Sequence, residues 1–156
     1  LHLLSRRQRQ MCIRDRNMIL IVAVDDRNGM TFNHRRQSQD KQLRERILSM
    51  TKNGKLWMNA YSHKQFVDSE DTGQIQEAED FLEKAGEKDY CFVENLEIEK
   101  FRAKIEKIIL CKWNRRYPGD FFFTIDVNDG SWKLKGVEEF SGSSHEKITL
   151  EVYEHE

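Results

Sequence analysis

The chain has 156 residues, and its 26 basic and 27 acidic side chains give a net charge of −1. Charged residues make up 34% of the chain and hydrophobic residues 38%, a composition typical of a highly charged globular domain. The longest apolar runs, such as 19–24, are far too short to span a bilayer. The sequence therefore argues against a membrane protein, and we expect a cytoplasmic location.

The first 17 residues differ from the rest of the chain. The stretch from Arg6 to Arg16, RRQRQMCIRDR, matches one reading frame of an adapter DNA used in transposase-based sequencing libraries. We therefore interpret residues 1–17 as an adapter-derived, disordered artefact and expect the natural start at Met18. Without their five Arg and one Asp, the net charge falls from −1 to −5. A mildly acidic remainder disfavours a general binder of nucleic-acid backbones.

From Met18 onward, strand patterns alternate with helical patterns, and two further strands follow. The run MILIVAV is continuous and β-branched, as in a buried strand, whereas Leu43, Ile47 and Leu48 recur at helical spacing. The predicted strands are 18–24, 55–58, 90–93, 107–113, 131–140 and 148–152, and the predicted helices are 38–50, 62–66, 75–85 and 96–104. This order predicts a single three-layer α/β domain (residues 18–156) with a mostly parallel central sheet and an antiparallel C-terminal edge.

The sequence lacks the motifs of several kinds of metal, redox, nucleotide and hydrolase sites. Cys91 and Cys111 lie inside apolar strands without a CxxC pair, so we expect buried, reduced thiols. The histidines are isolated from one another and form no HxHxDH cluster, which argues against a metal-dependent hydrolase such as ribonuclease Z. The chain also contains no P-loop, GxGxxG or GxSxG motif.

The order of the elements and several short sequence segments resemble dihydrofolate reductase. These segments are MILIVAVDDRNGM (18–30), SQDKQLRERI (38–47), GKLWMNAYSHKQF (54–66), QEAEDFLEKAGEKDYCFVEN (76–95) and SSHEKITLEVYE (143–154). The resemblance covers nearly all of 18–154 and implies a dihydrofolate-reductase-like fold with a ligand cleft and NADPH as cofactor. It also places Asp40 near the acidic residue of the family's first helix, which implies a proton donor in the cleft.

The sequence departs from this family where the cofactor phosphates would bind. Ala60-Tyr61-Ser62 stands in place of the family's Arg-x-Thr, and Glu94-Asn95 stands in place of its paired glycines. A carboxylate at a glycine position repels phosphate and crowds its path. The cofactor is therefore left open, since NADPH binding by the usual route and ordinary folate reduction are not expected.

The candidate ligand-binding residues follow the predicted strands or precede a helix. Asn59 and Ser62 lie beyond one strand and Glu94 and Asn95 beyond the next, where open α/β sheets bind ligands. Arg35 and Arg36 precede a helix N-terminus and can bind a phosphate or carboxylate. The alternatives are an acid that complements the helix dipole at Asp40 and a solvated loop in which the two arginines pair with Asp25 and Asp26.

Three functions stay open at this point. The first is a bacterial cytoplasmic protein that binds a small anionic ligand, such as a nucleotide or pterin, in a crevice at Asp40, Asn59 and Glu94. The second is a non-catalytic regulatory or binding module. The third is an RNA-associated protein that uses Arg35, Arg36 and the basic-aromatic stretch 112–116. The sequence specifies neither a reaction nor an oligomeric state.

Overall fold

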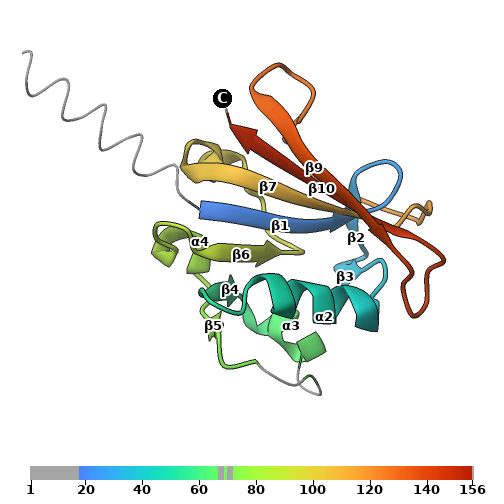
Figure 1. Ribbon diagram of the computed structural model, residues 1–156, viewed down its shortest axis with the longest axis horizontal. Helices are drawn as coiled ribbons and strands as arrows, with labels where there is room; N and C mark the ends of the chain where they lie inside the picture. The colour runs from blue at the N-terminus through green and yellow to red at the C-terminus, as the bar shows by residue number, and fades with distance from the viewer. Residues whose placement is uncertain (1–17, 67–68, 70–71, 156) are drawn as a thin grey trace, which may run out of the picture.

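A seven-stranded sheet forms the centre of the molecule (Figure 1). The computed structural model describes residues 18–155 apart from 67–68 and 70–71, so the predicted artefact at 1–17 lies outside the described residues. In spatial order the strands are β5 (Ile75–Glu77), β4 (Leu56–Met58), β6 (Tyr90–Val93), β1 (Met18–Val24), β7 (Ile105–Lys112), β10 (Ile148–His155) and β9 (Trp132–Phe140).

The strand directions confirm the predicted sheet. β1 pairs in parallel with β6 and with β7, and β4 pairs in parallel with β5 and with β6. β10 runs antiparallel to β7, and β9 runs antiparallel to β10 with a register shift at Val152/Tyr153. The carboxyl ends of β1, β4, β6 and β7 therefore meet at one edge of the sheet, and polar segments follow them there.

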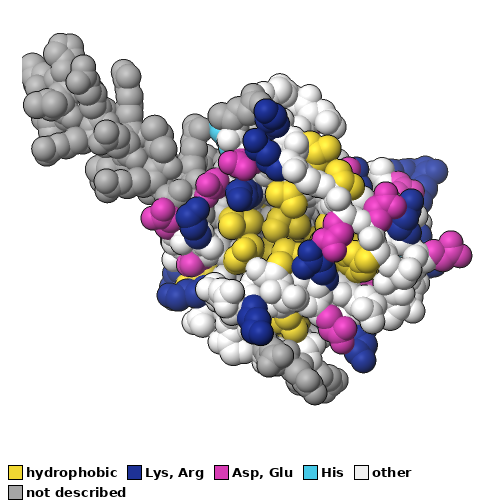
Figure 2. All heavy atoms as spheres, viewed as in Figure 1, with side chains coloured by type: hydrophobic (Ala, Val, Ile, Leu, Met, Phe, Trp, Pro, Cys, Tyr) yellow, Lys and Arg dark blue, Asp and Glu magenta, His cyan; other side chains and the backbone are white. Residues whose placement is uncertain are grey.

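Short helices cover the two faces of the sheet. They are α2 (Lys41–Met50), α3 (Ala60–His63), the 3-10 helix η1 (Lys64–Phe66), α4 (Phe81–Lys84) and the 3-10 helix η2 (Glu99–Lys104). Leu43, Ile47 and Leu48 of α2 pack against the face that presents Ile21, whereas Phe81 packs against the other face. Figure 2 shows hydrophobic side chains gathered over the central strands above α2. This helix of ten residues therefore covers only part of that face of the sheet.

Three segments differ from their predicted structure. The predicted helix 96–104 is helical only over Glu99–Lys104, and there as a 3-10 helix. Residues 75–85 have helical spacing, but Ile75–Glu77 forms strand β5 beside β4 and only Phe81–Lys84 is α-helical. Pairing with an available sheet edge outweighs the local helical pattern there. The predicted loop 33–38 contains β3 (Arg35–Arg36), which forms a small sheet with β2 (Gly29–Phe32) and β8 (Phe121–Phe122).

Among the described residues, no helix has the length and apolar character needed to cross a membrane. The two described cysteines are free and fully buried, as predicted. Burial raises the pKa of Cys111 to about 12 and raises that of Cys91 further, so both thiols stay protonated near neutral pH.

This burial predicts slow thiol labelling. In a Cys12→Ser variant, which removes the cysteine outside the described residues, we expect Ellman's reagent to label Cys91 and Cys111 only after denaturant is added. The measurement is the absorbance of the released thiolate over time. Rapid labelling of either cysteine in the native protein would contradict the burial of these two strands.

Candidate functional site

The crevice predicted at the carboxyl ends of β4 and β6 is occupied by the protein's own side chains. Nε and Nη2 of Arg36 donate to the two carboxylate oxygens of Glu94, over 2.9 Å and 3.2 Å. Nη2 also donates to the carbonyl of Tyr61 over 3.1 Å, and the guanidinium lies 4.5 Å from the centre of the Tyr61 ring. Burial alone would lower the pKa of Arg36, but the hydrogen bond and the charge of Glu94, together with the charge of Tyr61, outweigh it and raise the pKa. Arg36 is therefore held charged and in a fixed position.

The amide side chains beside this ion pair also bond to each other. Asn59 caps α3 by accepting from the backbone N–H of Ser62 over 3.0 Å, and its Nδ2 donates to Asn95 over 2.9 Å. The structure thus brings together five of the six predicted ligand-binding residues, namely Arg36, Asn59, Ser62, Glu94 and Asn95. Arg35 lies beside them on β3 with an exposed side chain. Because Glu94 neutralises Arg36, an entering phosphate would have to displace a carboxylate that binds in bidentate fashion.

Asp40 lies in a different cluster, at the N-terminus of α2. Its carboxylate accepts from the backbone N–H groups of Gln42, Ser143 and Ser144, over 2.9, 2.9 and 2.8 Å. It also accepts from His145 Nδ1 over 3.0 Å, and its side chain is completely buried. Burial alone would raise the pKa of Asp40, but the hydrogen bonds from His145, Ser143 and Ser144 outweigh it and hold the pKa well below its usual range. A carboxyl group with so low a pKa is ionised at neutral pH and has no proton to donate. The geometry therefore favours an anchoring role for Asp40.

His145 joins this carboxylate to two hydroxyl groups. Its Nε2 lies 2.8 Å from the Tyr117 hydroxyl and 3.1 Å from Ser38 Oγ, and its ring stacks on Trp113 at a centroid distance of 4.6 Å. Since an ionised carboxylate only accepts, the hydrogen between Asp40 and His145 lies on Nδ1, and Nε2 faces the two hydroxyl groups.

The order hydroxyl, imidazole, carboxylate is the one that activates a nucleophilic serine. Here Tyr117 competes with Ser38 for the same nitrogen, and the backbone N–H groups at the start of α2 are already bonded. Lys41 N donates to Ser143 Oγ over 3.0 Å, and Gln42 N donates to Asp40 over 2.9 Å. We therefore assign this network to fastening the turn between β9 and β10 onto α2.

The helix predicted to start at residue 38 begins at Lys41, with Asp40 as its N-cap, and the contact between Asp40 and His145 was not predicted. The sequence signal for this contact was the triplet Ser143-Ser144-His145, whose N–H and O–H donors suit a buried carboxylate. A second signal was Gly142, where a Cβ would lie 2.5 Å from Asp40 Oδ2. Neither signal identifies its partner a hundred residues away.

A basic groove lies between α2 and the segment α3–η1. It has a volume of about 840 Å³, and among the described residues the cationic side chains that line it are Lys41, Arg44, Lys52 and Lys64, against one carboxylate, that of Glu45. Two of its donors, Arg44 Nε and Gln65 Nε2, are buried and find no acceptor in the part of the chain that the structure describes. A groove of this size fits a small-molecule ligand, and donors of this kind suit an anion.

The described residues contain no group of three or more His, Cys, Asp or Glu side chains placed to hold a metal ion. The seven-stranded mixed sheet, with polar residues beyond the carboxyl ends of its parallel strands, defines a dihydrofolate-reductase-like α/β domain.

Comparison with solved structures supports this class. Dihydrofolate reductase from Enterococcus faecalis, complexed with NADP(H) and RAB-propyl, superposes with a TM-score of 0.61 over 90% of this chain and 97% of that chain, at 9% sequence identity. Identity this low establishes the fold alone. No protein-family profile matches the sequence, and no curated protein matches it.

Proposed function

We propose that this protein binds a small anionic molecule, with the dimensions of a nucleotide or pterin, in the basic groove beside α2. The observation that carries the proposal is a pair of buried donors, Arg44 Nε and Gln65 Nε2, that find no acceptor among the described residues. A buried donor left unsatisfied costs about 1–3 kcal/mol. An anion that accepts hydrogen bonds from both atoms removes that cost, so the removal of this cost favours anion binding.

The charges around the groove support the same ligand class. Lys41, Lys52 and Lys64 are exposed and have no ion-pair partner among the described residues, so their charge is available to a ligand. Arg44 is oriented by its Nη1, which donates to Gln39 over 3.3 Å. Such a pre-oriented guanidinium loses less freedom when it binds a phosphate or carboxylate.

Ordinary folate reduction is not part of the proposal. The ion pair between Arg36 and Glu94 lies where the resemblance places the cofactor phosphates, so the guanidinium of Arg36 is not free to hold NADPH there. The cofactor, if there is one, is left open. The ligand site is therefore moved from the crevice expected from the sequence to the groove beside α2.

A thermal-shift screen of the full chain tests the proposal. The ligands are NADPH, NADH, dihydrofolate, methotrexate and common nucleotides, and a ligand at a hundredfold excess over its Kd stabilises by about 2.7 kcal/mol. We expect a shift with at least one phosphate-bearing ligand, and an Arg44→Met variant to bind it at least about tenfold more weakly, because a charge-assisted hydrogen bond contributes about 1.5–3 kcal/mol.

Arg46→Met is the matched control, since Arg46 lies on the same helix but pairs with Glu138 and does not line the groove. The absence of any shift, or an equal loss in both variants, would overturn the proposal. The absence of any shift would instead favour the second reading, a binding module whose partner is another macromolecule.

The RNA reading rests on exposed arginines, of which Arg35, Arg115 and Arg116 are the clearest. Lys112 is already paired with Glu151 over 2.9 Å. Salt-sensitive RNA binding that is lost when Arg115 and Arg116 are changed to Ala would favour it over a small ligand.

A further inference from the structure

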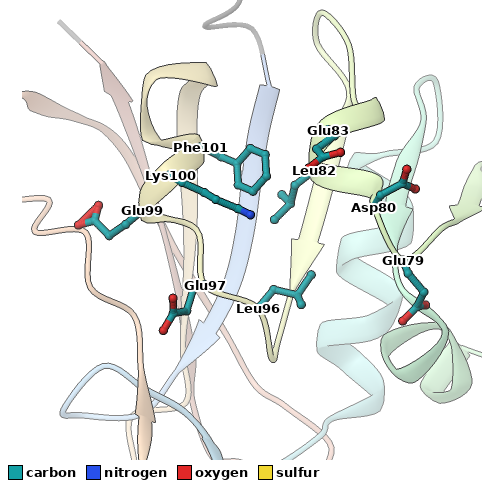
Figure 3. Close-up of a pocket in the computed structure, with 9 residues that line it drawn as sticks. All are labelled: Glu79, Asp80, Leu82, Glu83, Leu96, Glu97, Glu99, Lys100 and Phe101. Atoms are coloured by element: carbon teal, nitrogen blue, oxygen red, sulfur yellow. The ribbon is translucent and has the colours of Figure 1, made fainter.

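A second pocket lies on the opposite face of the sheet from α2, between α4 and η2 (Figure 3). Its volume is about 500 Å³, within the range of small-molecule sites. Leu82, Leu96 and Phe101 form its apolar floor, and in Figure 3 all three point into the space between the two helices. Leu96 and Phe101 are only partly buried against the core, so their exposed surface is available to a ligand.

The rim of this pocket is strongly acidic. Five of its nine lining residues are carboxylates and one is a lysine. Three of the carboxylates are engaged nearby, since Asp80 lies 3.5 Å from Lys84, Glu99 lies 3.9 Å from Arg102, and Glu79 accepts from a backbone N–H over 3.0 Å. Within the described residues Glu83 and Glu97 have no ion-pair partner, and Figure 3 shows them on opposite sides of the floor.

The pocket already holds a cation of its own. The ammonium group of Lys100 lies 5.2 Å from the centre of the Phe101 ring, and its side chain extends into the pocket in Figure 3. An ammonium over an aromatic face, in a pocket with an acidic rim, is the arrangement that recognises organic cations. Lys100 is exposed and on a flexible stem, so a ligand with a larger apolar body can displace it.

We propose that this pocket binds a small organic cation that joins an apolar ring to an ammonium group. The ring packs on Leu82, Leu96 and Phe101, and the ammonium lies between Glu83 and Glu97 in the position that Lys100 now takes. This site is independent of the anion groove, because the two share no residue and lie on opposite faces of the sheet.

Calorimetric titration of the full chain with tryptamine tests the inference, with indole-3-propionate as the ring-matched anion. We expect tryptamine to bind at least about tenfold more tightly, because reversing the ligand's charge turns several weak attractions into repulsions. Glu83→Gln combined with Glu97→Gln should weaken tryptamine binding about fivefold. The double variant Glu87→Gln and Glu146→Gln, which changes exposed carboxylates outside the pocket, should leave it unchanged.

The Lys100→Ala variant separates a lysine that competes with the ligand from a lysine that is only structural. Removing the internal competitor should tighten tryptamine binding about threefold, whereas a merely structural lysine would leave the affinity unchanged or lower it. Equal affinity for the two indoles, no binding of either, or weaker binding to Lys100→Ala would overturn the inference. Arg44→Met, which tests the anion groove, should not alter tryptamine binding, so the two proposals can fail separately.

Discussion

Replacing Asp40 with alanine is expected to lower the free energy of unfolding at pH 7 by about 3–5 kcal/mol. The substitution removes the N-cap of α2, which alone contributes about 1 kcal/mol. It also removes the carboxylate acceptor from the partly buried N–H groups of Ser143 and Ser144 and from the buried Nδ1 of His145. Urea unfolding followed by circular dichroism measures the change.

Asp80→Ala is the matched control, since Asp80 also precedes a helix but makes no side-chain capping bond. We expect that control to cost less than about 0.5 kcal/mol, as at other surface positions. A loss at Asp40 no greater than the loss at Asp80 would contradict the anchoring role that we assign to the cluster.

The pH dependence of stability follows from the same carboxylate. Because the folded pKa of Asp40 lies below its ordinary value of 3.8, the unfolded chain takes up the proton first as the pH falls. The stabilisation from Asp40 is therefore complete above that value and is lost as the pH falls through the folded pKa. The part of the stability difference between the native protein and Asp40→Ala that comes from this carboxylate should narrow as the pH falls below 4.

Breaking the ion pair in the crevice has the second large effect. Glu94→Ala is expected to destabilise the protein by about 2–3 kcal/mol, because it leaves Arg36 partly buried and without its bidentate acceptor. A double-mutant cycle with Arg36→Ala should give a coupling energy above about 1 kcal/mol. Denaturant unfolding of the four proteins measures it.

The exposed pair of Arg46 and Glu138 provides the comparison for that cycle. A solvent-exposed pair should couple by less than about 1 kcal/mol. Equal coupling in the two cycles would show that the pair in the crevice is as loosely held as a surface pair, and the argument that it excludes cofactor phosphate would fail.

Much of the sheet could be predicted from the sequence. The run Met18–Val24 and the alternation of Ile148, Leu150 and Val152 carry strong periodic signals, and both segments are strands as predicted. Ile75–Glu77 was wrongly predicted as helix, because its pairing with β4 is a tertiary interaction that local spacing does not encode.

The sites were harder to predict than the strands. Proximity of Asn59 and Glu94 followed from their positions after adjacent parallel strands, and the structure brings their segments together. The ion pair that Glu94 forms could not be predicted, because Arg36 reaches Glu94 across 58 residues of sequence. The partnership of Asp40 with His145 spans 105 residues and leaves no local pattern.

The most direct test of the anion site is a two-dimensional NMR titration that observes arginine Nε–H and glutamine side-chain amide signals. The protein is the full chain, and the ligand is the phosphate-bearing compound that gives the largest thermal shift. The account predicts that the signals of Arg44 Nε–H and Gln65 Nε2 move on binding, whereas that of Arg36 Nε–H, held by Glu94, does not. Movement of the Arg36 signal with that of Arg44 unchanged would place the ligand in the crevice and contradict the account.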